Sequence, residues 1–542
     1  MTEDAGRRPA HPAPPPSPYM RTIQFYDCTL RDGAQGPGIN FSLMDKVRLA
    51  EALDAFGMDY IEGGWPGANP KDTEFFRHMA GHPLRHAQLV AFGATCRGGV
   101  MPSEDPQVQA LMASQCRTVS IFGKSWLLHV REVLKVSPEE NLRMISDTVR
   151  HLHDAGRRVF FDAEHFFDGF ADAPEYAMAA LQAAVDGGAR AVVLCDTNGA
   201  TLPYDINRIA AEVRSKLPSS VMLGIHCHND SDCAVASSLT AVRAGCDLVE
   251  GTVNGFGERC GNADLCSIIP AVAFKMAPVG VAPSLRLPEL TALSRLFYEI
   301  AVLHERPQQP YVGSGAFAHK GGMHVNAVAK DSRTFEQISP ESVGNRRHIL
   351  LSELSGVSNV VLKARELGVR LEDGGSQARA ILAEIKRREA QGYAFEAADA
   401  SFKLLVERLL ERHQPLFELD GFRVIIEKRG PNEKCLSEAT IKVRVKGQTA
   451  LTAAEGEGPV NALDLALRKA LTGFFPKVGN MRLRDFKVRI LDGADGTAAQ
   501  TRVLIDSSDG TRDWGTVGMS ENIIEASWQA LLDSVEYYLG QC

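Results

Sequence analysis

Short apolar runs alternate with longer amphipathic runs from Thr22 to about Ala277, and this alternation constrains the fold more than any other feature. The apolar runs are rich in β-favouring residues and begin near Ile23, Met58, Ala87, Thr118, Val159, Ala191, Val221 and Leu248. Helix-like patterns follow several of them, as at Leu43–Phe56, Pro138–Ala155, Tyr176–Val185 and Ala234–Ala244. Repeated strand–helix units require a parallel sheet. Eight such units in about 260 residues predict a (β/α)₈ TIM barrel rather than an open doubly wound sheet.

Polar clusters fall at the carboxyl ends of these predicted strands, which is where a barrel carries its active site. They are Arg31–Asp32, Glu62–Gly64, Glu164–His165, Asp196–Gly199, His226–His228 and Asn254–Gly255. A dinucleotide-binding sheet would need G-x-G-x-x-G after the first strand, and the sequence has another pattern there. The barrel interpretation is therefore preferred.

The chain changes character on either side of the barrel. Residues 1–20 are polar and proline-rich, which predicts a disordered tail. We predict the barrel domain at residues 21–285 and helical linker subdomains at 286–415, with helices at about 358–368 and 375–412. Residues 416–542 return to alternating strands and predict an α+β domain that binds a ligand or dimerises.

A weak internal duplication runs through this last domain. Strand-like runs at Ala439–Val445 and Thr501–Asp506 are each followed by a glycine-containing turn and a helix. The turns are expected at Gly456–Gly458 and Gly515–Gly518, the helices at Asn461–Leu471 and Glu521–Tyr538, and further strands at Phe422–Glu427 and Phe486–Leu491. Two small α+β units back to back are predicted.

Composition excludes several classes of protein. The 542 residues carry a net charge of −8 without long charged runs, which argues against a nucleic-acid binder. No apolar run approaches the roughly 20 residues that a membrane-spanning helix needs. The 11 cysteines are odd in number, and some lie inside apolar strands, as Cys195 and Cys227 do. This usage predicts a soluble protein in a reducing cytoplasm.

Asp32, His226 and His228 are the predicted metal ligands. Side chains two apart on a strand point the same way, so the two histidines share a face. One carboxylate and two neutral imidazoles suit Mg²⁺, Mn²⁺, Zn²⁺ or Co²⁺ and leave positions open for a substrate. The alternative is a buried salt bridge between Asp32 and a protonated histidine.

Three further residues are candidates for catalysis or substrate binding. Arg31, beside a predicted ligand, would bind a carboxylate or stabilise an enolate oxygen, or else form a structural ion pair inside the barrel. Glu164, flanked by Phe166 and Phe167, would act as a base in an apolar setting or support the metal ligands. Thr197 would bind a substrate carboxylate or cap the next helix.

A glycine-rich loop, Gly251–Asn262, follows the eighth strand. Its glycines permit close approach of the backbone to a ligand. Asn262 at its end would supply an oxygen to the metal or cap the helix that begins near Ala263.

Three motifs together resemble the α-isopropylmalate, homocitrate and citramalate synthase family. They are D-x-T-L-R-D-G-x-Q at Asp27–Gln35, H-x-H-N-D at His226–Asp230 and N-G-x-G-E-R-x-G-N at Asn254–Asn262. The resemblance runs from about Thr22 to the C-terminus. Members of this family are barrel enzymes that condense acetyl-CoA with an α-keto acid on a divalent metal.

The resemblance implies a role for each matching residue. Asp32, His226, His228 and Asn262 would surround the metal, with Mn²⁺ or Mg²⁺ favoured over Zn²⁺ or Co²⁺. Arg31 and Glu164 would be catalytic, and Thr197 would bind the keto acid. His324 resembles the histidine that the linker sends into the partner's active site, which implies a homodimer. The C-terminal domain would bind the end-product amino acid and dimerise.

Two departures resemble a citramalate synthase subgroup. The chain reads D-A-E-H-F-F at Asp162–Phe167 where isopropylmalate synthases usually read S-P-E-D-A-T-R, and it has Ala34 where many members have Glu. The subgroup implies pyruvate as keto acid, (R)-citramalate as product and isoleucine as effector. A pocket narrowed by bulky side chains would fit pyruvate, and the candidates are Trp65, Phe122, Phe166 and Phe167. The alternatives are a leucine-regulated isopropylmalate synthase, an HMG-CoA lyase-like or aldolase activity, and an amino-acid sensor without barrel chemistry.

Overall fold

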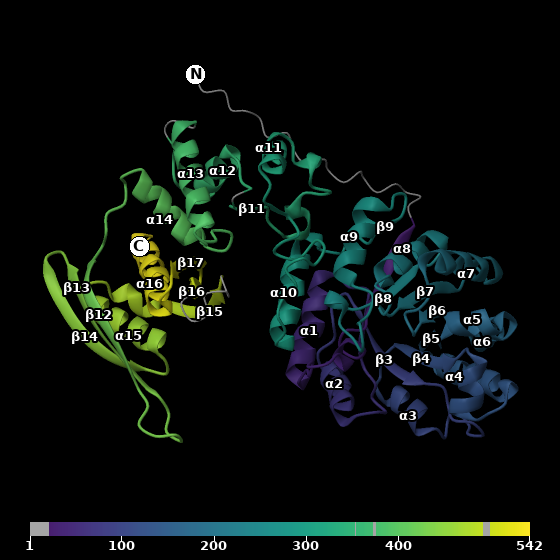
Figure 1. Ribbon diagram of the computed structural model, residues 1–542. Coiled ribbons are helices and arrows are strands. Elements are labelled where there is room, and N and C mark those ends of the chain that lie inside the picture. Colours follow the sequence, from purple (N-terminus) through teal and green to yellow (C-terminus); the bar gives the residue numbers. More distant parts are fainter. Residues whose placement is uncertain (1–20, 353, 372–374, 492–498, 542) are drawn as a thin grey trace. The chain divides into compact units, whose positions relative to one another are not determined.

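The computed structural model describes residues 21–352, 354–371, 375–491 and 499–541, and the tail predicted at residues 1–20 lies outside these ranges. The chain forms two compact units. The first unit comprises Met1–Phe317 and Ile338–Arg346, and the second comprises Ala318–Gln337 and Arg347–Cys542. Figure 1 shows the elements of each unit.

Within the described residues, the first unit contains eight parallel strands that close into a barrel. The strands are β1 (Thr22–Asp27), β2 (Tyr60–Gly64), β3 (Gln88–Ala94), β4 (Thr118–Lys124), β5 (Arg158–Glu164), β6 (Ala191–Asp196), β7 (Met222–Cys227) and β8 (Leu248–Gly251). Strand β1 pairs with both β2 and β8, which completes the ring. The predicted TIM barrel is therefore confirmed.

Helices follow the strands and cover the outside of the barrel (Figure 1). They are α1 (Leu43–Phe56), α2 (Pro70–Ala80), α3 (Pro106–Ala113), α4 (Pro138–Asp154), α5 (Phe166–Asp172), α6 (Pro174–Gly187), α7 (Pro203–Lys216), α8 (Ala234–Ala244) and α9 (Leu265–Lys275). Local sequence fixes several of their starts. Ser42 and Asp45 form a capping box before α1, and Asn69 and Asp105 accept backbone hydrogen bonds at the caps of α2 and α3, whose first residue is proline.

The segment after the barrel is more ordered than a linker. Gly280 and Val281 form strand β9 (Gly280–Val281) and pair with β1. Helix α10 (Leu290–Ala301) then packs against α1, so it belongs to the same unit as the barrel.

The second unit begins with a helical region. It contains α11 (Gly322–Lys330), α12 (Val357–Glu366), α13 (Ser376–Ala390) and α14 (Asp399–Leu409), with a short parallel pair of β10 (Ala318–His319) and β11 (His348–Ile349). The single helix expected at 375–412 is wrong, because the chain breaks between α13 and α14. Gly392 adopts a φ of 101° at this break, and a Cβ there would lie 2.3 Å from Leu491.

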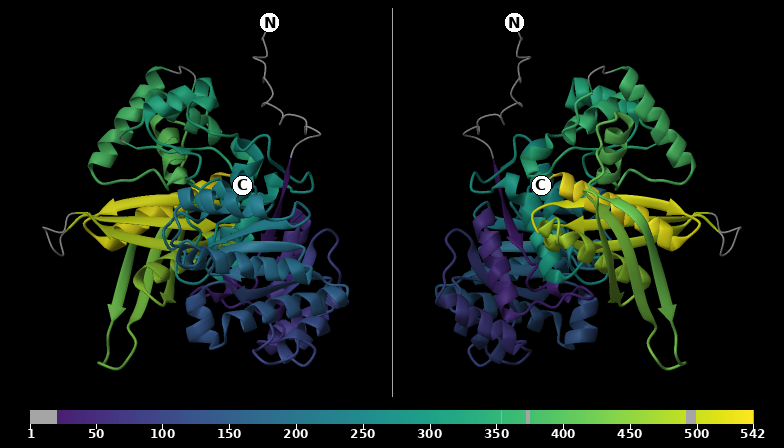
Figure 2. Two further views of the ribbon diagram at one scale, coloured as in Figure 1. Left: turned by 90° about the vertical axis from the view of Figure 1, so that its right-hand side faces the viewer. Right: turned by 90° about the vertical axis from the view of Figure 1, so that its left-hand side faces the viewer.

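Two antiparallel three-stranded sheets, each followed by a helix, form the rest of the second unit. The first is β12 (Glu418–Glu427), β13 (Leu436–Val445) and β14 (Gln448–Gly456), followed by α15 (Pro459–Thr472). The second is β15 (Arg482–Ile490), β16 (Thr501–Ser508) and β17 (Asp513–Ser520), followed by α16 (Ile523–Gly540). Figure 2 shows the two sheets, green and yellow, with strands that run in different directions. The predicted duplication is present.

One feature of that duplication was predicted wrongly. Gly515–Gly518 lies inside β17 rather than in a turn. A Cβ on Gly518 would lie 1.9 Å from the Ala526 carbonyl, so this glycine lets α16 rest directly on the strand. Matching contacts relate the copies: the Thr452 hydroxyl donates to Ala466 O and the Thr516 hydroxyl to Ala530 O, each at 2.8 Å.

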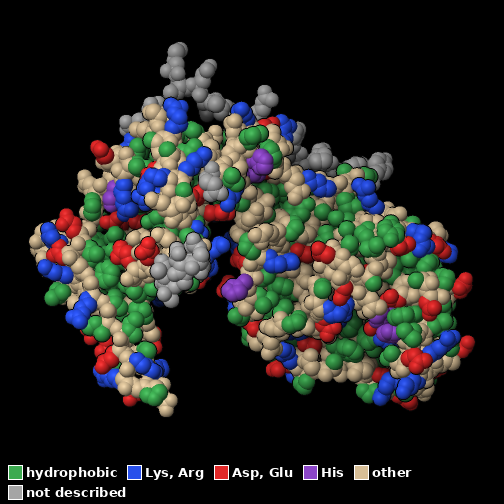
Figure 3. Space-filling model, viewed as in Figure 1, with side chains coloured by type: hydrophobic (Ala, Val, Ile, Leu, Met, Phe, Trp, Pro, Cys, Tyr) green, Lys and Arg blue, Asp and Glu red, His purple; other side chains and the backbone are tan. Residues whose placement is uncertain are grey.

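The barrel interior is filled below the functional end of the strands. Tyr26, Tyr60 and Phe160 are buried there with ring centroids 5.1–6.2 Å apart. Among the described residues, no helix is both long and apolar enough to cross a membrane. On the face drawn in Figure 3, acidic and basic side chains are interspersed.

Candidate active site

A cavity of about 260 Å³ opens at the carboxyl ends of the barrel strands. It is lined by Arg31, Asp32, Gln35, Trp65, Phe92, Phe122, Asp162, Glu164, Cys195, Thr197, His226, His228, Glu258 and Arg259. The structure thus brings together six of the predicted site residues, and a seventh, Asn262, is hydrogen-bonded to Asp32 at its edge. His324 lies in the other unit, exposed on α11 and stacked on Phe335 with 4.2 Å between ring centroids.

Asp32, His226 and His228 converge on one point of this cavity. Each offers a ligand atom, and these atoms all lie within 4.8 Å of one another. His226 Nε2 is 3.6 Å from Asp32 Oδ2, and the two imidazole centroids are 5.3 Å apart. All three side chains are buried. One carboxylate and two imidazoles at this spacing form a donor set typical of a divalent cation.

The protonation states suit such a cation. Burial opposes ionisation of Asp32, but Arg31 and the two histidines lower its pKa to about 2. Burial and the neighbouring His226 lower the pKa of His228 to about 4. A carboxylate and a neutral imidazole at neutral pH are the forms that coordinate metals.

Two buried polar atoms at the site have no protein partner: His228 Nδ1 and Asn262 Oδ1. Unpaired buried groups of this kind are costly, and a bound ligand or ion would satisfy such atoms. The Asn262 amide nitrogen donates to Asp32 Oδ1 at 3.2 Å and to Phe256 O at 3.0 Å. Asn262 does not cap the following helix, because Asp264 takes that position before α9. The predicted ligands therefore fit a metal.

Arg31 makes an ion pair with Glu62 and lies 3.4 Å from Asp32 Oδ2. Its guanidinium also lies over the Phe92 ring, 3.7 Å from the centroid. Tyr26 donates to the same Glu62 carboxylate at 2.9 Å. The structural ion pair, one of the two alternatives predicted for Arg31, is thus present, and Arg31 also lines the cavity beside the predicted metal ligands.

The surroundings of Glu164 differ from those expected. Its carboxylate forms an ion pair with Lys124. Phe166 and Phe167 belong to the hydrophobic core and do not line the cavity, so the apolar setting predicted from them is wrong. The chain turns into α5 at His165, where φ is 55°, and the two rings that follow are buried away from the cavity.

Thr197 lines the cavity at the end of β6. Its hydroxyl accepts a hydrogen bond from the His165 backbone N–H at 2.9 Å. The alternative that Thr197 caps the next helix is wrong, because α7 begins at Pro203 after Leu202. Arg259 donates to the Thr197 carbonyl and to both carboxylate oxygens of Asp230, which fixes the glycine-rich loop against this strand.

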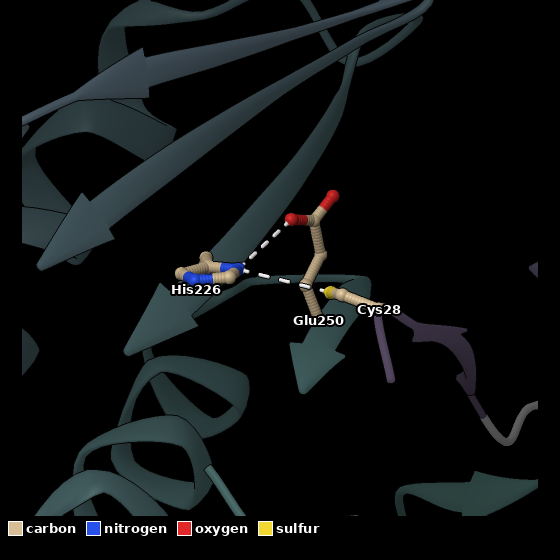
Figure 4. A group of neighbouring side chains, drawn as sticks. All are labelled: Cys28, His226 and Glu250. Atoms are coloured by element: carbon tan, nitrogen blue, oxygen red, sulfur yellow. Dashed lines mark hydrogen bonds and ion pairs between the residues drawn. The ribbon is translucent and has the colours of Figure 1, made fainter. Parts of the chain in front are cut away.

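Two residues behind the predicted metal ligands were not predicted from the sequence. Figure 4 shows Glu250 and Cys28 pointing toward His226. His226 Nδ1 lies 3.2 Å from Glu250 Oε2 and 4.0 Å from the Cys28 sulfur. Glu250 is the partner of the imidazole, because its oxygen is closer and a thiol sulfur is a weak acceptor. A charged residue inside the apolar run Leu248–Gly251 was the signal for Glu250.

Other buried carboxyl groups lie close to Glu250 inside the barrel. Burial raises the pKa of Glu62, Asp162 and Glu250, and the neighbouring carboxylates raise it further. Asp162 accepts from the Ser120 hydroxyl at 3.0 Å. A cluster of buried carboxyl groups beside the predicted metal ligands favours a bound cation.

Comparisons with known proteins identify the family of this chain. The chain matches the HMGL-like family over residues 22–297, the homocitrate synthase post-HMGL domain-like family over 311–392, and the LeuA allosteric (dimerisation) domain over 396–539. Among solved structures it resembles a hydroxymethylglutaryl-CoA lyase from Pseudomonas aeruginosa (TM-score 0.44, 18% identity, 52% of this chain and 93% of that one). The chain is therefore an HMGL-like barrel protein with a LeuA-type domain.

Full-length relatives narrow the assignment. An (R)-citramalate synthase from Geobacter sulfurreducens is 51% identical over 96% of this chain and 98% of its own length. A probable 2-isopropylmalate synthase from Methanopyrus kandleri is 31% identical over 95% of this chain and 97% of its own. The chain belongs to the (R)-citramalate synthase family. It is an enzyme of the transferase class.

Proposed function

We propose that this enzyme condenses acetyl-CoA with pyruvate and hydrolyses the resulting thioester, which gives (R)-citramalate and CoA. The observation that carries the proposal is the convergence of Asp32, His226 and His228 beside Arg31 in one cavity. The names of the full-length relatives support the choice of reaction. A 2-isopropylmalate synthase is the alternative, supported by a relative at lower identity.

Asp32, His226 and His228 would hold a divalent metal, with Asn262 contributing its unpaired amide oxygen. When bound, such an ion polarises a keto-acid carbonyl as a Lewis acid. We favour Mn²⁺ or Mg²⁺ over Zn²⁺ or Co²⁺, because the carboxylate and amide oxygens are hard ligands.

The remaining groups carry the proton and charge chemistry. A base removes a proton from the acetyl methyl group of acetyl-CoA, and Glu164 in the cavity and His324 are the candidates. The carbanion carbon then bonds to the keto carbon, whose oxygen becomes an alkoxide and takes up a proton. Arg31 stabilises the negative oxygen that develops, and Thr197 binds the keto-acid carboxylate. Water then cleaves the thioester and releases the CoA thiol.

Three aromatic rings support pyruvate as the keto acid. Trp65, Phe92 and Phe122 line the same cavity as the metal ligands. We expect this aromatic wall to limit the keto-acid side chain to about the size of a methyl group. Each added methylene is worth about 1–3 kcal/mol in discrimination, so 2-ketobutyrate should react more slowly and 2-ketoisovalerate more slowly still.

The second unit is assigned to regulation. Residues 416–542 carry the duplicated sheet-and-helix architecture within the range that matches the LeuA allosteric (dimerisation) domain. We propose that this domain binds isoleucine as a feedback effector and joins two chains into a homodimer, and that residues 286–415 link it to the barrel at 21–285. In such a dimer the exposed His324 would reach the partner's cavity. We propose a cytoplasmic location, which the free thiols of the described cysteines support.

Release of CoA thiol from acetyl-CoA tests the reaction. The purified enzyme is assayed with pyruvate, 2-ketobutyrate, 2-ketoisovalerate and 2-ketoglutarate, before and after exhaustive chelation with EDTA. We expect the highest kcat/KM with pyruvate, no turnover with 2-ketoglutarate, loss of activity with EDTA and recovery with Mn²⁺ or Mg²⁺. A higher kcat/KM with 2-ketoisovalerate than with pyruvate would establish the isopropylmalate alternative. Full activity after chelation would show that the reaction does not require a metal.

A further inference from the structure

The aromatic wall of the cavity is built around Trp65. Its indole packs edge-on against Phe92 and Phe122, with centroid distances of 5.6 and 5.5 Å and interplanar angles of 84° and 81°. Phe92 and Phe122 stack on each other at 5.5 Å. The two phenyl rings come from the neighbouring strands β3 and β4, whereas Trp65 follows the end of β2. The indole therefore depends on contacts other than strand pairing for its orientation.

Gln107, on the first turn of α3 and outside the residues that line the cavity, supplies such a contact. The indole Nε1–H of Trp65 donates to Gln107 Oε1 at 2.6 Å. The amide nitrogen of the same side chain donates to Gly67 O at 3.2 Å. Because an indole nitrogen only donates, these two bonds fix which way the amide points. A Cβ on Gly67 would lie 2.3 Å from Gln107 Oε1, so the glycine leaves space for the contact.

The backbone of Trp65 is held independently. Its N–H donates to Asp72 Oδ2 at 2.9 Å, and Asp72 forms a buried ion pair with Lys46. Lys46 also donates to Gly63 O at 2.9 Å. Gly64 adopts a φ of 141°, and a Cβ there would lie 2.4 Å from the Asp72 carboxyl carbon. The main chain at Trp65 is thus fixed from α1 and α2, and the indole plane is fixed from α3.

We propose that Gln107 is a positioning residue that holds the Trp65 indole in place and thereby sets the largest keto-acid side chain that the cavity accepts. This inference rests on the proposed function for its substrate class. Without the Gln107 carbonyl, the indole N–H has no partner at that position, and packing on Phe92 and Phe122 holds the ring less firmly. Rotation of the ring would enlarge the space beside the reacting carbonyl, so 2-ketobutyrate gains relative to pyruvate.

Three variants on α3 test the inference in the full-length enzyme. Gln107→Met removes the acceptor at similar length, and Gln107→Glu keeps an acceptor for the indole. Gln109→Met is the matched control, since Gln109 is exposed two residues further and its amide donates only to Ser103 O. We measure kcat/KM for 2-ketobutyrate divided by that for pyruvate. Gln107→Met should raise this ratio on the order of tenfold, whereas the other two variants should leave it within about twofold.

A second readout does not depend on the substrate. Trp65 fluorescence is obtained as the difference between each protein and its Trp65→Phe derivative. In Gln107→Met the emission maximum of Trp65 should shift, and acrylamide should quench its fluorescence more strongly. In Gln107→Glu both properties should match the wild type. If Gln107→Met does not fold cooperatively, Gln107→Ala replaces it.

The two readouts separate failure of this inference from failure of the proposed function. The positioning role is overturned if Gln107→Met changes neither the substrate ratio nor the Trp65 fluorescence. A changed fluorescence with an unchanged ratio also overturns it, because the indole would then not limit substrate size. If the wild type does not use pyruvate, the proposed function fails, and an unchanged Trp65 signal would still reject the contact with Gln107.

Discussion

His226 and Glu250 are register partners on the adjacent strands β7 and β8, and their side chains meet inside the barrel with Nδ1 3.2 Å from Oε2. In the tautomer with the proton on Nδ1, this N–H donates to Glu250 Oε2, and Nε2 faces Asp32 Oδ2 at 3.6 Å. Outer carboxylates of this kind fix the tautomer and ring orientation of a metal-binding histidine. Glu250 therefore acts on the proposed metal through His226.

Removal of the Glu250 acceptor should weaken metal binding. Glu250→Leu is expected to raise the Mn²⁺ dissociation constant roughly 10–100-fold, and Glu250→Gln should have a smaller effect because its amide oxygen still accepts. Calorimetric titration of the chelated enzyme measures both. Cys28→Ala is the matched control, since it removes the other neighbour of Nδ1, 4.0 Å away, without removing a hydrogen-bond acceptor of comparable strength. Equal affinities in all four proteins would contradict the assignment.

Arg31 and Glu164 should affect turnover more than folding. Loss of a preorganised charge-stabilising donor costs about 10²–10³ in rate, so Arg31→Lys should lower kcat by that order. General-base catalysis contributes about 10²–10⁴, so Glu164→Gln should lower kcat by that order. Lysine is chosen because removing the cation would leave Glu62 buried without its partner, a change that itself costs about 3–5 kcal/mol.

The control for this prediction is the thermal unfolding transition. Both variants should unfold cooperatively near the wild-type midpoint. A variant with near wild-type kcat would remove that residue from catalysis, and a variant with a broad, early transition would show that the residue acts on stability instead.

Local sequence patterns predicted the barrel, and the barrel in turn predicted that Asp32, His226 and His228 would converge at the carboxyl ends of its strands. Strand–helix alternation gave the architecture, and the two-residue spacing of His226 and His228 placed them on one face. The partners of the catalytic candidates depend on strand register, which one sequence does not reveal. Lys124 and Glu164 are 40 residues apart and are register partners on β4 and β5.

The errors have non-local causes. Glycines at 515 and 518 were interpreted as a turn, but in β17 they make room for a helix and a loop that approach the strand closely. The helix expected across 375–412 contained no proline, and its break at Gly392 depends on a tertiary contact with Leu491. In each case packing against a distant segment decided the structure.

Feedback inhibition should be lost with the C-terminal domain. Isoleucine should lower the rate of the full-length enzyme, and a chain truncated after Arg412 should be insensitive to it. The truncation should also lower the unfolding midpoint, because α14 packs on the second sheet: the Val517 N–H donates to Ser401 Oγ at 3.0 Å, and Arg408 pairs with Asp533 and Glu536. Rates at increasing isoleucine and a thermal scan measure both effects. The regulatory assignment would be contradicted if isoleucine, leucine and valine all left the rate of the full-length enzyme unchanged.

Asp27 should make the stability of the barrel depend on pH. Its buried carboxyl accepts from the Thr29 N–H at 3.0 Å and the Thr29 hydroxyl at 2.7 Å, and Thr29 Oγ1 accepts from the Val253 N–H at 2.8 Å. Burial outweighs these hydrogen bonds and raises the pKa of Asp27 from 3.8 to about 7. Between those values the folded state holds a proton that the unfolded state has lost. The contribution of Asp27 to stability therefore falls as pH rises from about 4 to 7 and is constant above that range.

Asp27→Asn removes this titration. The loss of one hydrogen-bond acceptor lowers the stability of the variant by a constant amount, but the direction in which its stability relative to the wild type changes with pH is fixed. The free energy of unfolding of the variant minus that of the wild type should become more positive between pH 5 and pH 8, by up to about 3 kcal/mol, because roughly two units of the pKa shift lie within this range. Asp45→Asn is the control: Ser42 lowers the pKa of Asp45, which is ionised in both states over this range, so its difference from wild type should be flat. A flat difference for Asp27→Asn would mean that the Asp27 carboxyl is ionised in the folded barrel throughout, with the Thr29 hydrogen bonds outweighing its burial.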